Sequence, residues 1–235
     1  GLGVNKISEQ QKPLALVVGA GPGLGDALLD RFASGGYQAI GYARNSRQSV
    51  NGQDILSVDL QNIDETEDAV QHLLATYGVP KVIVHNPAKL IIDPLAETTI
   101  DGFEAAWQSM VLSAFVIAKS ALPAMVDAGG GSFLVSGATA SLRGGGRFAA
   151  FASAKFALRG LTQSLAREFQ PKGIHVAHMI LDGILDTNAS RKLHNLPTEK
   201  MMQTDAVAQT YWDIAHQPKS VWTHELDLRP STEGF

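Results

Sequence analysis

The sequence predicts an α/β fold in a single domain, with a doubly wound, mostly parallel sheet of about seven strands and helices on both faces. The chain has 235 residues, a usual size for one α/β domain. Apolar segments rich in β-branched residues alternate along it with amphipathic segments, the pattern expected when crossover helices cover a parallel sheet. A cluster of glycines follows the first apolar segment and precedes a helical pattern.

Composition and charge narrow the class of protein. Hydrophobic residues make up 45% of the chain and charged residues 18%, which indicates a compact, soluble domain and excludes wholesale disorder. The formal net charge is −4 and no run of Lys or Arg is present, so neither nucleic acid nor a membrane is expected as a partner. The longest apolar stretch, 110–125, is interrupted by Lys119 and Pro123 and is shorter than the ~20 residues of a membrane-spanning helix.

Cysteine is absent, which excludes disulfides, a thiolate nucleophile and a cysteine-ligated zinc, and favours the reducing cytoplasm as the setting. The seven histidines form no ligand pattern, so no metal site is predicted. Residues 1–12 are polar and unlike a signal peptide, and we expect them to be a disordered N-terminus or one foreign to the protein. The nucleotide-binding domain is predicted over 13–235, with a lid segment at about 188–203.

The strands are predicted from the apolar segments, in chain order at residues 14–18, 38–43, 54–58, 81–85, 132–136, 174–181 and 221–228. A helix at 24–33 carries leucine and phenylalanine at helical spacing and ends before two glycines. The next helix begins after Asn62, a good N-cap with Glu65 three residues later, and stops before Gly78 and Pro80.

Two longer helices are predicted at about 99–127 and 149–169, the second ending before Pro171 and Gly173. Each is apolar on more than one face. One face is expected to pack on the sheet and another to contact a second copy of the chain, which predicts a homodimer or homotetramer. The alternative is burial of the second face beneath the C-terminal segment.

The glycine cluster lies where a strand-to-helix turn would bind a dinucleotide. Gly19 permits a sharp turn off the strand, and Gly21 and Gly23 keep the turn free of side chains so that backbone N–H groups can approach a pyrophosphate. Gly25 lets the helix pack close to the sheet, with its positive N-terminal end toward the anion. Leu24 occupies the place of the last glycine in G-x-G-x-x-G, and glycine is common in such turns anyway, so the cluster alone leaves cofactor binding open.

Residues after the second strand indicate which nucleotide would bind. An acidic residue there would hold the adenosine ribose 2′-hydroxyl, but this chain has Ala43, followed by Arg44 and Asn45. A guanidinium can pair with a 2′-phosphate, so the sequence predicts NADP(H) in preference to NAD(H). The alternative is a solvated surface arginine.

Two further strand ends carry candidate cofactor ligands. Asp59 and Leu60 follow the third strand, where a carboxylate can accept a hydrogen bond from the adenine amino group. Asn86 follows the fourth strand, where a buried amide can join neighbouring strands beside the cofactor.

These features together make the chain resemble the short-chain dehydrogenase/reductase family over almost its whole length. The resemblance rests on Gly19, Gly23, Gly25 and Asp59 and on the segments 84–88, 121–125, 151–155 and 182–187. It implies a Rossmann-type fold, a nicotinamide cofactor contacted also by Pro87, Leu185 and Thr187, and an oligomer built on the two long helices. It also implies a catalytic set of Asn, Ser, Tyr and Lys.

Most of that catalytic set is missing here. Lys155 stands at the lysine position, where the resemblance implies a bond to the nicotinamide ribose, but Phe151 stands where the tyrosine should be. Ala138 occupies the serine position and Met110 the asparagine position. A phenyl ring has no proton to give, and losing a general acid costs ~10²–10⁴ in rate, so we expect ordinary carbonyl reduction to be very slow.

The sequence therefore leads to two main hypotheses for the function. The first is an NADP(H)-dependent oxidoreductase with an altered or lost proton relay, for which reduction of an activated C=C bond is easier than reduction of C=O because water can protonate carbon. The second is a non-catalytic NADP(H)-binding sensor or assembly protein. A lyase or isomerase that keeps the cofactor is a third, weaker reading.

Two features near the predicted substrate site remain. Asp182 replaces the proline that the family usually has before Gly183. Its carboxyl group is either an acid or base beside the nicotinamide or, as we prefer, part of a turn that bonds its own backbone. The predicted lid carries four basic residues, Arg191, Lys192, His194 and Lys200. These side chains would either attract an anionic substrate or simply be solvated. In contrast, Met110, Ala138 and Phe151 favour an apolar substrate.

Overall fold

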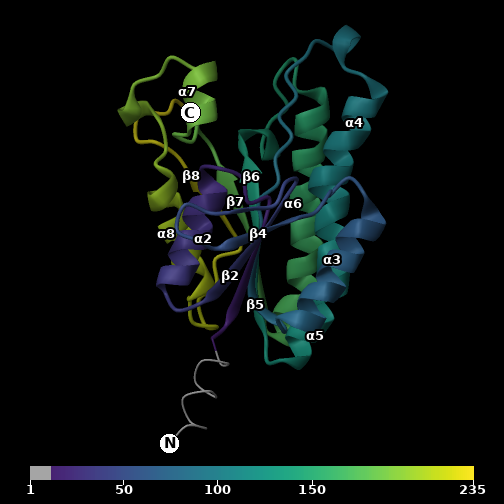
Figure 1. Ribbon diagram of the computed structural model, residues 1–235. Coiled ribbons are helices and arrows are strands. Elements are labelled where there is room, and N and C mark those ends of the chain that lie inside the picture. The colour runs from purple at the N-terminus through teal and green to yellow at the C-terminus, as the bar shows by residue number, and fades with distance from the viewer. Residues whose placement is uncertain (1–11) are drawn as a thin grey trace, which may run out of the picture.

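The computed structural model describes residues 12–235 as one three-layer α/β domain (Figure 1). Eight strands form a single sheet in the order β3-β4-β2-β1-β5-β6-β7-β8. Every neighbouring pair is parallel except β3 with β4. The order reverses at β1, as in a doubly wound sheet, so the predicted fold class is confirmed. The expectation made for residues 1–12 lies, except for Lys12, outside the described residues.

The strands are β1 (Leu14–Val18), β2 (Gln38–Ala43), β3 (Arg47–Gln48), β4 (Asp54–Ser57), β5 (Pro80–His85), β6 (Gly131–Ala138), β7 (Ile174–Leu181) and β8 (Glu225–Leu228). The predicted bounds of β1, β2 and β7 agree with the structure. The prediction missed β3, whose two residues are too short to show alternation. It also began the last strand too early, because Val221 is exposed and precedes the ladder.

The helices are α2 (Leu24–Ser34), α3 (Ile63–Thr76), α4 (Ile100–Trp107), α5 (Ser113–Asp127), α6 (Ala149–Phe169), α7 (Asn188–Leu193) and α8 (Thr204–Ala215). The N-cap before α3 is confirmed, since Asn62 accepts from the Glu65 amide at 3.0 Å. The helix predicted at 99–127 is two helices joined by a π-helical turn, Gln108–Leu112. The sequence analysis proposed neither α7 nor α8.

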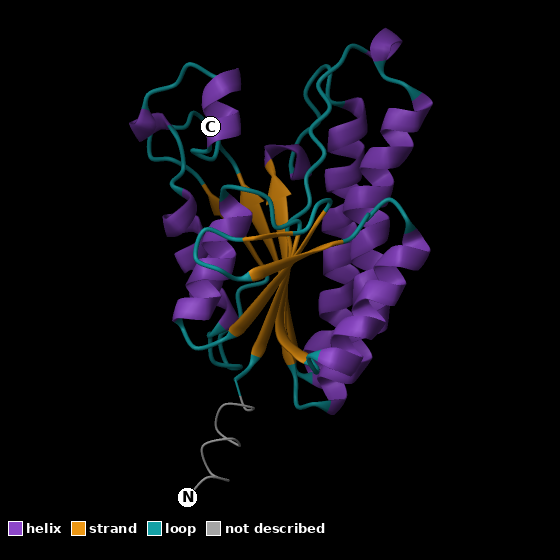
Figure 2. Cartoon of the chain, in the orientation of Figure 1, coloured by secondary structure: helices purple, strands orange, loops and turns teal. Residues whose placement is uncertain are grey.

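Two apolar cores lie on opposite faces of the sheet. Helices α3, α5 and α6 pack on one face, and α2 and α8 pack on the other (Figures 1 and 2). The alternation along β1 explains the arrangement, because Leu16 joins the first core and Val17 the second. With both faces covered, the open positions of the sheet are the ends of its strands, where the functional residues were predicted.

The α4–α5 unit, Ile100–Asp127, is long and apolar enough to cross a membrane, but 56% of its most apolar window is buried inside the domain. This burial is typical of a core helix. On the outer side of α4, α5 and α6, the rings of Phe103, Trp107, Phe115 and Phe156 are 41–46% exposed. The alternative that the C-terminal segment covers this second face is therefore wrong for these four side chains.

Candidate functional site

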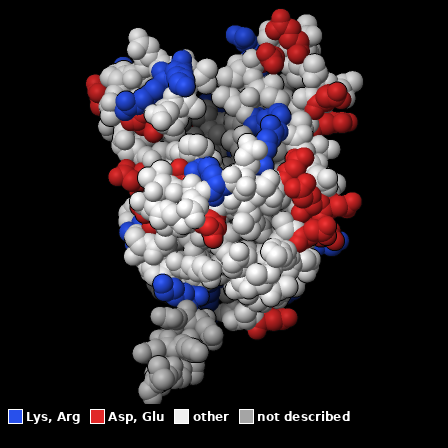
Figure 3. Space-filling model, viewed as in Figure 1, with Lys and Arg blue, Asp and Glu red and all other residues white. Residues whose placement is uncertain are grey.

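A cleft of about 1230 Å³ opens at the carboxyl ends of the central strands, and Figure 3 shows it as a hollow flanked by Lys and Arg. The cleft gathers most of the predicted site residues, which are Gly19, Gly21, Leu24, Gly25, Arg44, Asp59, Leu60, Asn86, Pro87, Ala138, Phe151, Lys155, Leu185 and Thr187. Four predicted residues do not line it: Gly23, Asn45, Met110 and Asp182.

The glycine turn has the shape that the sequence analysis predicted. Gly19 has φ +81°, and a Cβ atom there would lie 2.5 Å from the Pro87 nitrogen. A Cβ at Gly25 would lie 2.7 Å from backbone atoms of Ala20, so the close packing of helix and turn requires glycine. Gly23, at φ +105°, instead makes room for the Thr187 side chain, whose Cγ2 would be 2.6 Å from an added Cβ.

The turn leaves room for an anion at the N-terminus of α2. A Cβ at Gly21 would meet nothing within 4 Å, which means that this part of the turn faces open space in the cleft. The first residues of α2 have no side-chain cap, so their N–H groups point to the turn without a side-chain acceptor. A helix N-terminus of this kind binds phosphate groups, and the cradle therefore fits a pyrophosphate.

Two arginines follow β2, and they have different surroundings. Arg44 lines the cleft and is exposed, and its guanidinium forms no ion pair or hydrogen bond within residues 12–235. Arg47, which the sequence analysis did not single out, donates to the Ala20 carbonyl at 3.0 Å and to Asp26 at 2.9 Å. Arg47 thus fixes the glycine turn, whereas Arg44 remains free for a ligand.

The remaining residues predicted at the nucleotide end of the cleft differ in position, because two of them line the cleft and one does not. Asp59 and Leu60 line the cleft after β4, and one Asp59 oxygen accepts from the Gln61 amide at 3.0 Å. The second Asp59 oxygen has no partner among the described residues, as the predicted adenine contact requires. Asn45, which we also expected at the cofactor because it follows Arg44, is exposed and lies outside the cleft, so the geometry gives no support to cofactor binding by this residue.

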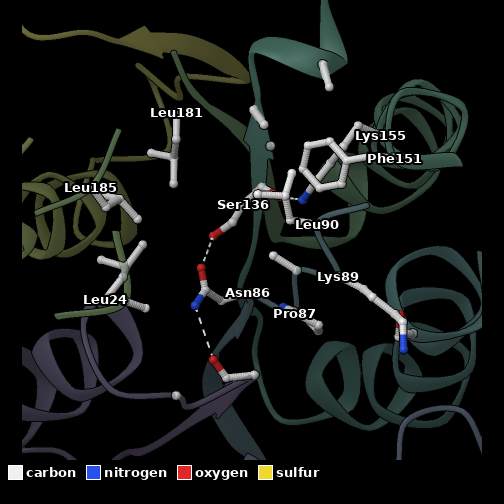
Figure 4. Close-up of a pocket in the computed structure, with 18 of the residues that line it drawn as sticks. Leu24, Asn86, Pro87, Lys89, Leu90, Ser136, Phe151, Lys155, Leu181 and Leu185 are labelled. Carbon is white, nitrogen blue, oxygen red and sulfur yellow. Dashed lines mark hydrogen bonds between the residues drawn. The ribbon is translucent and has the colours of Figure 1, made fainter. Parts of the chain in front are cut away.

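Asn86 joins neighbouring strands at the middle of the cleft, as predicted. Its amide nitrogen donates to the Gly19 carbonyl at 3.2 Å, and its oxygen accepts from the Ser136 hydroxyl at 2.7 Å (Figure 4). Ser136 also bonds the hydroxyl of the buried Tyr211 at 2.7 Å. This connection from the glycine turn to α8 was not predicted, because Ser136 and Tyr211 are 75 positions apart and no local pattern links them.

The inner wall of the cleft is apolar where the family resemblance implies hydroxyl groups. Ala138 ends β6, and Phe151 lies in the first turns of α6, 8% exposed. Lys155 lies one turn further along α6, is 2% exposed, and donates from Nζ to the Ser136 carbonyl at 3.0 Å. Figure 4 shows the Phe151 ring beside the Lys155 amine, 5.6 Å from ring centre to nitrogen.

Burial changes the acid strength of the amine. Desolvation lowers the pKa of Lys155 to about 8. Nearby His85, on β5, is fully buried and bonds Ser113 at 2.8 Å. Burial, reinforced by the Lys155 cation, lowers the pKa of His85 to about 3, so this histidine is neutral.

Met110 lies in the π-helical turn and is fully buried in an apolar cluster that also contains Phe151. The expectation that Met110 makes the pocket itself more apolar is wrong. Ser109, the residue before it, lines the cleft instead and donates to the Ala105 carbonyl at 2.7 Å.

Asp182 follows β7 and is buried, but its carboxylate has neither predicted surrounding. The Thr139 hydroxyl donates to it at 2.5 Å, Arg229 pairs with it, and Arg143 lies 3.6 Å away. The preferred reading of a self-bonded turn is wrong, because these partners come from distant parts of the chain. The geometry gives no support to an acid or base either, since Asp182 does not line the cleft and its bond to Thr139 orients a residue that does.

Thr187 precedes the predicted lid segment, and its side chain caps α7 by accepting from the Ser190 amide at 3.0 Å. The base of the lid is closed by a short parallel bridge between Leu185 and Met202. Of the basic lid residues only His194 lines the cleft; Arg191 pairs with Asp186, at 2.5 Å between Nε and Oδ1. This pair holds the pKa of Asp186 at about 2.

Comparison with known proteins agrees with this geometry. Residues 13–196 match the model of the short chain dehydrogenase family. The chain belongs to this family. A short-chain dehydrogenase from Rhodopseudomonas palustris is 34% identical, with a TM-score of 0.78 over 93% of this chain and 98% of that one.

Other proteins are similar to the chain at lower sequence identity. An uncharacterised oxidoreductase of Staphylococcus aureus (strain USA300) is 22% identical, over 92% of this chain and 96% of its own. A probable galactose dehydrogenase of Rhizobium meliloti is 28% identical over 76% of this chain and 73% of its own. The structure of ElxO with NADP bound has a TM-score of 0.83 at 20% identity, covering 92% of this chain and 97% of that one.

Within the described residues, no group of three or more His, Cys, Asp or Glu side chains is arranged to hold a metal ion. The site combines the backbone N–H groups of the glycine turn with the buried amine of Lys155. When bound, a nicotinamide cofactor would supply or accept a hydride in this cleft.

Proposed function

We propose that this family member is an NADP(H)-dependent oxidoreductase that reduces activated C=C bonds and has lost ordinary carbonyl reductase activity. The observation that carries the proposal is the contrast within one cleft. The glycine turn and Arg44 fit a phosphorylated dinucleotide, whereas Phe151 and Ala138 stand where the family resemblance implies the tyrosine and serine hydroxyls.

The preference for NADP(H) rests on Arg44. Its guanidinium lines the cleft without an ion partner in the described part of the chain, and the preceding Ala43 offers no carboxylate to a ribose hydroxyl. A 2′-phosphate would therefore gain a charge-assisted hydrogen bond, and a 2′-hydroxyl would gain little. The ElxO structure and that of a metagenomic short-chain oxidoreductase contain NADP, which agrees with this preference.

The cleft wall points to the substrate class. Leu90, Ile92 and Leu193 line its mouth together with the cations Lys89 and Arg143. An apolar conjugated carbonyl compound fits the leucine and isoleucine side chains, and an anionic group on it would fit the cations at the rim. Because Phe151 and Ala138 stand where the family resemblance implies the tyrosine and serine hydroxyls, the carbonyl oxygen would lack these two partners, and addition of hydride to the conjugated carbon is favoured over addition to the carbonyl carbon.

We also propose that the protein forms a homodimer or homotetramer. The exposed rings of Phe103, Trp107, Phe115 and Phe156 lie on α4, α5 and α6, the helices for which the sequence analysis predicted a second packing face. Exposed aromatic side chains on adjacent helices are typical of an interface between protein chains.

Nucleotide binding tests the cofactor assignment. NADPH and NADH affinities, measured by fluorescence titration, should differ at least tenfold in favour of NADPH, and Arg44→Ala should weaken NADPH binding about tenfold or more while leaving NADH nearly unchanged. Arg167→Ala, which removes an exposed arginine at the far end of α6, is the matched control. Equal loss of both nucleotides in Arg44→Ala would reject the 2′-phosphate assignment.

Turnover tests the reaction. We expect NADPH oxidation with 2-cyclohexen-1-one and much slower oxidation with cyclohexanone, followed by absorbance and by product analysis. The substitution of three catalytic positions also agrees with the alternative of a non-catalytic sensor. Tight NADPH binding without turnover on any conjugated or simple carbonyl would reject the reductase and favour that alternative.

A further inference from the structure

The part of the cleft left for a substrate has basic side chains and no acidic one. Among the described residues that line the cleft, the one carboxylate side chain is Asp59, which lies with Arg44 at the nucleotide end. The family resemblance assigns Lys155 to the nicotinamide ribose. The basic side chains that remain are those of Lys89, Arg143 and His194. A substrate would therefore meet a positive surface at the mouth of the cleft.

Arg143 follows β6, and the fold leaves its guanidinium free of hydrogen bonds. Within residues 12–235 this group forms one ion pair, with Asp182 at 3.6 Å, and no hydrogen bond. The Asp182 oxygens are already bound by the Thr139 hydroxyl, at 2.5 Å, and by Arg229. Two guanidinium groups thus face one carboxylate, and one positive charge is left over. The Arg143 side chain is 56% exposed and that of Arg229 only 13%, so the charge that remains accessible is in the cleft.

Two glycines after Arg143 add backbone donors to the same place. Gly144 and Gly145 line the cleft, and their N–H groups donate to no backbone carbonyl within the described residues. The fold does not require glycine at either position, because neither has a left-handed φ and an added Cβ would meet its first neighbour at 3.6 Å and 3.4 Å, respectively. The missing side chains instead leave these N–H groups accessible to an acceptor.

The loop that carries these donors lies against the apolar inner wall. The neighbour of an added Cβ at Gly144 would be Ala152, which follows Phe151 on α6, and at Gly145 it would be the Phe148 ring. Lys89 also lines the cleft, but Figure 4 shows its amine extending away from Phe151 and Lys155. Arg143 is thus the cation that borders the apolar wall, at the edge of the hollow in Figure 3.

We propose that Arg143, with the N–H groups of Gly144 and Gly145, binds a carboxylate group of the substrate. This inference rests on the proposed reductase function and names its substrate class, apolar conjugated carbonyl compounds that carry a carboxylate. A guanidinium presents paired N–H donors that match the two oxygens of a carboxylate. The single negative charge of a carboxylate also equals the one positive charge left over beside Asp182. Arg143 is then a specificity-determining residue and takes no part in proton transfer.

The first test measures binding without turnover. Trans-cinnamate and its uncharged amide, cinnamamide, are titrated by calorimetry into the protein saturated with NADP⁺. Cinnamate should bind the wild type about tenfold more tightly or better, because hydrogen bonds between charged groups are strong. Arg143→Gln should weaken cinnamate binding by about tenfold or more and leave cinnamamide nearly unchanged. Arg143→Lys keeps the charge without the paired donors and should recover part of the affinity.

Arg147→Gln is the matched control. It removes the same charge from an exposed arginine of the same loop that does not line the cleft, and it should leave both affinities nearly unchanged. Equal weakening of cinnamate in Arg143→Gln and Arg147→Gln would show that the general positive field attracts the anion, and would overturn the proposal. Equal affinity of the wild type for cinnamate and cinnamamide would overturn it as well.

The second test compares two conjugated ketones that differ by one carboxylate, 4-phenylbut-3-en-2-one and its 4-carboxyphenyl analogue. With NADPH, the wild type should reduce the charged ketone with a kcat/KM about tenfold higher or more, and Arg143→Gln should remove this preference. The change should lie in KM and not in kcat, because Arg143 binds a group remote from the reacting atoms.

The outcomes separate this proposal from the reductase function. Turnover of both ketones without preference for the charged one would overturn the carboxylate site and leave the reductase function intact. Absence of turnover with both ketones, while cinnamate still binds through Arg143, would overturn the reductase function and leave the carboxylate site in place.

Discussion

The two ends of the cleft are built by different means. The nucleotide end is formed by backbone: Gly19 and Gly25 have contacts that exclude any side chain, and the N-terminus of α2 supplies N–H donors. The inner end is formed by side chains on rigid elements, Ala138 on β6 and Phe151 and Lys155 on α6. Only at the second end do the residues differ from the catalytic set that the family resemblance implies.

This difference follows from how much a substitution at each end would disturb the fold. A glycine that packs against backbone cannot be replaced without moving the turn, so the cradle is tied to the fold itself. A tyrosine hydroxyl can be removed with no such consequence, because Phe151 fills the same volume and packs in the same apolar cluster. Chemistry at the inner end can therefore change while the nucleotide site and the fold remain.

Restoring the hydroxyl groups is the strongest test of the comparison. The double variant Phe151→Tyr/Ala138→Ser should raise the rate of cyclohexanone reduction by ~10²–10⁴, equivalent to ~3–5 kcal/mol of barrier, since it returns a general acid beside the Lys155 cation. The measurement is kcat/KM for NADPH oxidation. Phe148→Tyr, which adds a hydroxyl to another ring that lines the cleft, is the control and should gain little. No gain in a folded double variant would mean that the inner end differs from the family in more than these two groups.

Features that depend on local sequence patterns could be predicted, whereas contacts between distant residues could not. The order of strands and helices and the glycine turn follow from local patterns, and β1, β2, β7 and α6 were predicted with their observed bounds. The short β3 was missed because two residues carry no periodicity. The π-helical turn that divides α4 from α5 was missed because its residues are as apolar as those of the helices.

The contacts of the site that join distant parts of the chain could not be predicted. Asp182 was expected to bond its own backbone, but Arg229 and Thr139, 47 and 43 positions away, bind its carboxylate. The Tyr211 hydroxyl reaches Ser136 only because α8 packs against the sheet. Such pairs depend on the packing of whole elements, and a single sequence contains no local signal for them.

The opposite change, adding a side chain to the nucleotide end, should damage the fold as well as binding. Gly19→Ala forces φ +81° on an L-residue and places Cβ 2.5 Å from the Pro87 nitrogen. We expect a loss of about 2–4 kcal/mol in the free energy of unfolding, measured by urea denaturation, and loss of NADPH binding. Gly21→Ala has open space around its Cβ, so its free energy of unfolding should lie within about 1 kcal/mol of the wild-type value. Equal stability of the two variants would contradict the view that the cradle is fixed by backbone packing.

Lys155→Met should raise the free energy of unfolding, a change smaller than that of Gly19→Ala and opposite in sign. In the unfolded chain the lysine pKa is near its ordinary 10.5, whereas burial lowers it to about 8 in the folded protein, so the unfolded state binds more protons between these values. Wild-type stability should therefore gain a favourable contribution as the pH rises from 8 toward 10.5, and Lys155→Met should lack it. At pH 7 the variant should be about 1–3 kcal/mol more stable in urea denaturation without nucleotide, because it no longer buries an unpaired charge; the lost bond to Ser136 offsets part of the gain. The exposed Lys172→Met should change neither value. A variant that is less stable at every pH would show that the fold compensates the Lys155 charge, and the inner end of the cleft would then hold a structural cation.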